Sequence, residues 1–111
     1  TDAAAAIRSF DQLAADTSLD AGLRDVARLR AASLAVDLQP FADVEQRMAP
    51  LVAPGNPWRF TALEMLAAAA LKAGQTDKAR QFYDTIIIDR AAPEAVRARA
   101  EVLIGLARGV Q

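Results

Sequence analysis

The sequence predicts an all-α fold, an α-solenoid of antiparallel helical hairpins with about six helices. Three observations support this prediction. Alanine, the best helix former, occupies 27 of the 111 positions. Apolar residues recur at helical spacing in segments that end at Pro, Gly or Asp. Similar segments return after about one helical hairpin of chain. Because alanine buries little area, we expect a core that depends on close helix contact more than on bulky side chains.

The first two predicted helices span residues 3–15 and 19–38. In the first, Ala6, Phe10 and Leu13 share one face at helical spacing. The residues after it, "DTS", break the pattern and offer N-caps for the second helix. The second helix carries arginines on one side and an apolar stripe on the other, predicted as Leu19, Leu23, Val26, Leu29 or Arg30, Ser33 and Leu34.

The next two predicted helices span residues 41–52 and 57–73. Pro50 damages a helix interior, so we expect the last turn of the first to be irregular. Its apolar stripe is predicted as Phe41, Val44, Met48 and Leu51 or Val52. Asn56 and Pro57 stand at the N-cap and the first position of the following helix, where these residue types are favoured.

The last two predicted helices span residues 76–89 and 93–108. Gly74 closes the preceding helix at the position after its end. The run of three isoleucines suggests a strand, but the surrounding pattern has helical spacing, through Ala79, Tyr83, Ile86 and Ile87. Pro93 and Gly109 then bound the final helix.

Internal similarity divides the chain into repeats. The anchors Ala6, Ala42 and Ala79 lie 36 and 37 residues apart. Three further pairs match at an offset of 73 residues, namely Leu23 and Val96, Arg24 and Arg97, and Ala27 and Ala100. We therefore predict a single domain over 1–111 that contains a half repeat (3–16), two full repeats (19–52 and 57–89) and a terminal capping helix (93–108).

The stretch "LEMLAAAALKAGQTDKARQFYDTIIID" resembles the tetratricopeptide repeat family. Gly74 matches its turn, and Ala79, Tyr83 and Ile86 match its second-helix face. In the other repeat Arg30 stands where the family has a small residue. This resemblance implies a right-handed helical-repeat solenoid that binds proteins. More narrowly, "PGNPWRFTALEMLAAAALKAG" and the passages around it resemble the C-terminal domain of bacterial YfgM-like ancillary subunits of the SecYEG translocon.

The narrower resemblance implies a membrane-anchored envelope protein with its interaction domain on the periplasmic side of the inner membrane. It also implies partners among translocon subunits or envelope chaperones. Because the chain starts at Thr1 without methionine, we expect a fragment that lacks an upstream segment. From the residues themselves, the absence of cysteine fits a periplasmic or a cytoplasmic protein and excludes only the disulfide-rich secreted class.

Composition excludes several kinds of chemistry. The 13 basic and 14 acidic residues are well mixed, which argues against a nucleic-acid surface. With neither cysteine nor histidine, the chain has no thiol or Ser-His-Asp catalysis and no Cys/His zinc site. The acidic pairs Asp16 with Asp20 and Asp84 with Asp89 are interpreted as helix caps or solvated side chains. We therefore predict no enzyme, no catalytic residue, no cofactor and no metal.

The predicted binding site is a groove on the first helices of the hairpins, rimmed by charge and floored by alanine. Its candidate residues are Arg24, Ala31, Trp58, Glu64, Ala68, Lys72 and Arg97, with Arg108 beside them. The competing interpretation is that the alanines only pack and the arginines are solvated. For Trp58, packing near Met48 and Leu51 is the favoured interpretation, since a large aromatic carries much apolar area.

The predicted function is a non-catalytic scaffold for protein–protein interaction that takes a peptide or a helix in this groove. The alternative is a structural homo-oligomerisation module whose exposed hairpin faces pair with another copy. A small-molecule binder or an enzyme is the third hypothesis. No segment of the chain is apolar over the roughly 20 residues that span a bilayer, so a membrane span within it is not expected.

Overall fold

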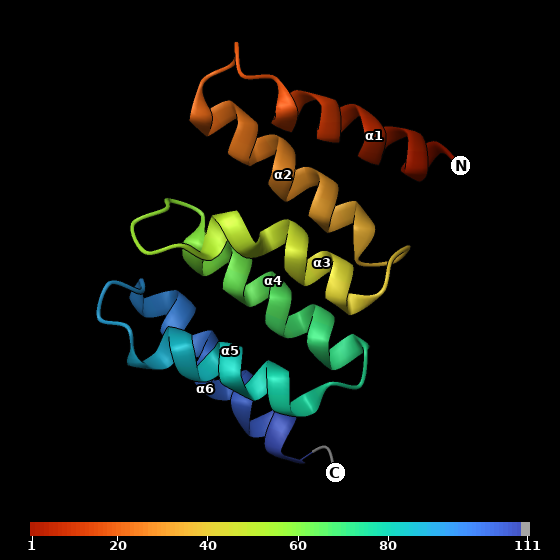
Figure 1. The fold of residues 1–111 in the computed structure, drawn as a ribbon. Helices are drawn as coiled ribbons and strands as arrows, with labels where there is room; N and C mark the ends of the chain where they lie inside the picture. The colour runs from red at the N-terminus through yellow and green to blue at the C-terminus, as the bar shows by residue number, and fades with distance from the viewer. Residues whose placement is uncertain (110–111) are drawn as a thin grey trace. The chain divides into compact units, whose positions relative to one another are not determined.

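The computed structural model describes residues 1–109 and shows six α-helices and one short 3-10 helix in that range, with no strand (Figure 1). The all-α prediction is confirmed. Helices that follow each other in sequence pack as pairs. The chain divides into two compact units, unit 1 (Thr1–Trp58) and unit 2 (Arg59–Gln111).

Unit 1 contains α1 (Asp2–Ala15), α2 (Ala21–Ala35), α3 (Phe41–Met48) and the 3-10 helix η1 (Ala49–Val52). In it α1 packs along α2, and α2 contacts α3. Side chains cap the first two helices at their N-termini. The Thr1 hydroxyl accepts from the N–H of Ala4, and the Asp20 carboxylate accepts from the N–H of Leu23. Such caps satisfy N–H groups that have no partner within the helix.

Pro50 ends α3 as the sequence predicts. Because proline lacks an N–H and clashes with the preceding turn, the α-helix stops at Met48 and continues as the tighter η1. This change of helix type keeps the predicted apolar stripe intact, since Phe41, Val44, Met48 and Leu51 are all buried.

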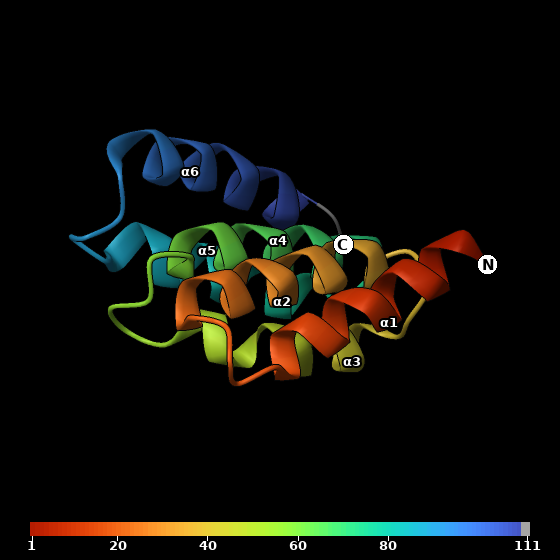
Figure 2. The same ribbon diagram turned by 90° about the horizontal axis from the view of Figure 1, so that it is seen from above.

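Unit 2 contains α4 (Arg59–Lys72), α5 (Thr76–Ile88) and α6 (Glu94–Gly109). Here α4 packs on α5, α5 packs on α6, and α4 and α6 make a smaller contact (Figure 2). Gly74 lies between α4 and α5 with a φ of 77°. This left-handed conformation favours glycine and ends α4 at the predicted place. The isoleucine run is helical, as predicted.

The start of α4 differs from the prediction. Pro57 and Trp58 form a turn, and the helix begins at Arg59. The Asn56 side chain accepts from the N–H of Trp58 and donates to the Asp25 carboxylate on α2 at 3.2 Å and to the Pro50 carbonyl at 3.4 Å. Asn56 therefore caps this turn instead of the first turn of α4, as was predicted, and it links the turn to α2 and η1.

The turns α1–α2 and α5–α6 have the same geometry. The carboxylate of Asp16 accepts from the N–H of Ser18, and that of Asp89 accepts from the N–H of Ala91, both at 2.9 Å. The N–H of each aspartate also closes its preceding helix, and each carbonyl accepts from the N–H three residues later. The match at an offset of 73 residues is therefore a repeat of structure as well as of sequence.

Burial defines the register of the second helix of each pair. Three positions at the same spacing are buried in α3 with η1 and in α5, namely Val44, Met48 and Leu51, and Ala79, Tyr83 and Ile86. The position equivalent to Ala79 is thus Val44, and the predicted anchor Ala42 is exposed. The sequence comparison selected Ala42 because it matched residue type, whereas the helix buries the stripe two positions later.

The first helix of each pair follows the same logic. In α2 and α4 the matching buried triplets are Ala31, Ala32 and Ala35, and Leu66, Ala67 and Ala70. The sequence comparison placed Arg30 at a position where a small residue is expected. In the structure a small residue does occupy the equivalent buried position, and it is Ala32, which is fully buried. The leucine stripe predicted for α2 is wrong, since Leu23 is 56% exposed. Alanine permits closer helix contact than leucine, and the alanine face is therefore the one that packs.

Candidate functional site

The seven candidate residues belong to both units. Arg24, Ala31 and Trp58 lie in unit 1, whereas the other four lie in unit 2, on α4 and α6. Within unit 2, Glu64, Ala68 and Lys72 share one side of α4 at intervals of four residues. Each unit's share of the predicted groove is described separately below. The side chain of Arg108 lies outside the part of the chain that the structure describes.

Arg24 and Arg97 hold the chain turns. Arg24 Nε donates to the Ala14 carbonyl at 2.9 Å, at the end of α1. Arg97 Nη2 reaches three carbonyls after α5, of Asp89, Arg90 and Ala92, at 3.1–3.4 Å. These carbonyls have no partner within a helix, so the guanidinium groups satisfy them.

Both arginines are only partly exposed, and Arg24 Nε and Arg97 Nη2 donate to carbonyls within the chain. The Nε of Arg97 is buried and makes no hydrogen bond. A groove rim requires side chains whose charged ends face a partner. The structure instead gives Arg24 and Arg97 the same role in two equivalent turns.

Ala31 and Trp58 present little surface. Ala31 is 1% exposed and belongs to the buried face of α2, so it offers no floor to a ligand. Trp58 is partly buried, and its backbone N–H donates to the Asn56 side chain at 2.8 Å. The sequence pattern around Trp58 is thus a structural joint that follows η1.

Glu64 is the candidate residue with the best defined partner. Its two carboxylate oxygens accept from Nε and Nη2 of Arg99 on α6, both at 3.0 Å. A bidentate pair of this kind fixes both side chains in one plane. Since Arg99 lies on the exposed side of α6, the pair marks a surface that α4 and α6 share.

We call this region the α4–α6 surface. The two helices run in the same direction, because α5 returns the chain between them (Figure 1). Ala68 and Lys72 are exposed on α4, and Val102 and Leu106 are 67% and 62% exposed on α6. The surface is therefore made of Glu64, Ala68 and Lys72 on α4 with Arg99, Val102 and Leu106 on α6.

An apolar pocket of about 380 Å³ opens on α6 beside the Glu64–Arg99 pair. Its lining is almost entirely apolar and comes from Ala98, Arg99, Val102 and Leu103. The arginine contributes its aliphatic stem while its guanidinium is turned to Glu64. A pocket of this size accepts one or two apolar side chains and offers no group for acid–base chemistry.

The Glu64 carboxylate changes the electrostatics of its neighbours. Its hydrogen bonds, and then its charge, raise the pKa of Arg99 above the usual value. Burial raises the pKa of Tyr83 on α5, and the charge of Glu64 adds to that effect. Both groups keep their ordinary protonation at neutral pH, so neither is tuned for catalysis.

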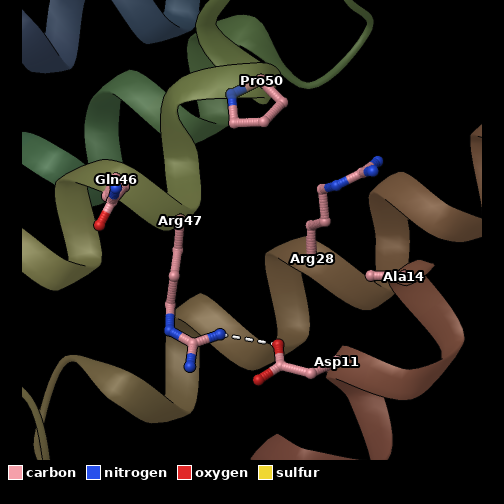
Figure 3. A pocket seen from close by; sticks show the side chains of 6 residues that line it. All are labelled: Asp11, Ala14, Arg28, Gln46, Arg47 and Pro50. Carbon is pink, nitrogen blue, oxygen red and sulfur yellow. Dashed lines mark hydrogen bonds and ion pairs between the residues drawn. The ribbon is translucent and has the colours of Figure 1, made fainter.

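A second pocket lies within unit 1 and is polar. It has a volume of about 260 Å³ and is lined by residues of α1, α2, α3 and η1 (Figure 3). Arg47 crosses it to the Asp11 carboxylate at 2.7 Å and also donates to Gln39. Arg28 points away from Asp11 and pairs with Asp25. These charges are paired within unit 1, and the pocket is interpreted as an interhelical contact.

The acidic pairs named from the sequence have structural positions. Asp16 and Asp20 make turn and cap hydrogen bonds, and Asp89 does the same after α5. Hydrogen bonds from Ser18, first from its side chain and then from its backbone, lower the pKa of Asp16. Within residues 1–109 no cluster of acidic residues has the arrangement of a metal site.

Sequence reasoning missed the α6 half of the surface. Arg99 was not among the candidate residues, although it is paired with Glu64. Val102 and Leu106 were not singled out, although they are the large apolar residues that α6 leaves exposed. The available signal was a second apolar stripe on α6, opposite the stripe formed by Ala100, Ile104 and Ala107.

Comparison with protein-family models, curated proteins and solved structures finds no match for the chain. Over the described residues, no helix combines the length and the apolar character that crossing a membrane requires.

Proposed function

We propose that the chain is a non-catalytic, tetratricopeptide-like module that binds a segment of another protein on the α4–α6 surface. The observation that carries the proposal is a fixed charge pair, Glu64–Arg99, beside exposed apolar side chains and an apolar pocket. Exposed apolar patches with polar rims are typical of protein interaction sites. Arginine and apolar anchors in such places supply much of the binding energy.

The geometry suggests what kind of segment fits. An apolar side chain of the partner enters the pocket between Ala98 and Leu103, where water is displaced from apolar walls. Because Glu64 already orients Arg99, less side-chain entropy is lost on binding. An amphipathic helix or an extended peptide with one apolar row meets these requirements.

The helical-repeat class is part of the proposal. It is supported by the equivalent turns after α1 and α5 and by the buried triplets that recur in α2 to α5. Repeated helix pairs that bury their faces by stacking are the physical basis of solenoids. The resemblance to YfgM-like subunits adds a location, the periplasmic side of the bacterial inner membrane, and partners among translocon subunits or envelope chaperones.

Site-specific photo-crosslinking tests the binding surface. A photoreactive residue replaces Ala68 or Val102 in a tagged full-length protein, and Leu38 serves as the control position because it is 51% exposed outside the surface. We expect the same partner to be captured from Ala68 and Val102 and not from Leu38. Equal capture from all three positions, or none from the first two, would contradict the proposed site.

A charge exchange sharpens this test. Arg99→Glu alone places two acids together and is expected to reduce capture strongly. The double exchange Glu64→Arg with Arg99→Glu keeps an ion pair but reverses the positions of the two charges. It therefore distinguishes whether capture requires the ion pair itself or requires the positive charge on α6. The location is tested separately with alkaline phosphatase fused to the full-length protein, since that enzyme is active only after export. An inactive fusion would contradict the envelope location alone.

A further inference from the structure

We draw no further inference here: the strongest candidate, the polar pocket that α1, α2, α3 and η1 line within unit 1, carries nothing because its two arginines, Arg28 and Arg47, already pair with carboxylates of the same unit, and nothing in the described part of the chain indicates which ligand it would take.

Discussion

At the scale of single residues, the two equivalent arginines show how one side chain can order a turn. Arg97 donates to three carbonyls that follow the end of α5, and Arg24 donates to one carbonyl at the end of α1. From the sequence, both arginines were predicted to line the charged rim of a binding groove. Their role depends on where the preceding helix ends, which composition and spacing do not specify.

Replacing Arg97 by methionine keeps the aliphatic stem and removes the donors. We expect a loss of about 1–3 kcal/mol in the free energy of unfolding, because hydrogen bonds to charged groups are stronger than neutral ones. Urea unfolding followed by circular dichroism measures it. The exposed Arg30 provides a control, and Arg30→Met should change stability by about 0.5 kcal/mol or less. Equal losses for both variants would exclude the turn as the cause.

Asp16 predicts a pH dependence of a definite sign. Its pKa is lowered in the folded chain by hydrogen bonds from Ser18, relative to an ordinary value of 3.8. The carboxylate therefore stabilises the fold fully above pH 3.8, and this contribution disappears as pH falls through the lowered folded pKa. Asp16→Asn should be less stable than wild type at neutral pH and equal to it in strong acid. A urea midpoint difference that stays constant with pH would contradict this assignment.

At the scale of helices, the high alanine content explains why the helix ends were predicted better than the buried helix faces. Asn56 caps the turn that precedes α4 instead of α4 itself. The all-α class and the ends of α3 and α4 follow from local chemistry, and Pro50 and Gly74 act where the sequence places them. The buried face of α2 does not, because Leu23 is exposed while Ala31, Ala32 and Ala35 are buried. A prediction from hydrophobic periodicity assigns large apolar residues to the buried face. Helices that approach each other closely instead bury their small residues.

Ala67 on α4 and Gly105 on α6 give two opposite predictions. Ala67 is fully buried, so Ala67→Leu should destabilise the chain by about 1–3 kcal/mol through overpacking. Gly105 lies inside α6 with open space at its Cβ, so Gly105→Ala should stabilise it by about 0.5–1 kcal/mol. Thermal and urea unfolding measure both changes. Destabilisation by Gly105→Ala would show that the position is not open.

At the scale of the molecule, the residues predicted from the sequence make up half of the proposed binding surface. Glu64, Ala68 and Lys72 share one side of α4, as helical spacing requires. Their partners on α6 come from a helix about 35 positions later, and which of its faces meets α4 depends on the α5–α6 turn. Arg99 and Glu64 meet only because that turn, held by Arg97, sets the orientation of α6.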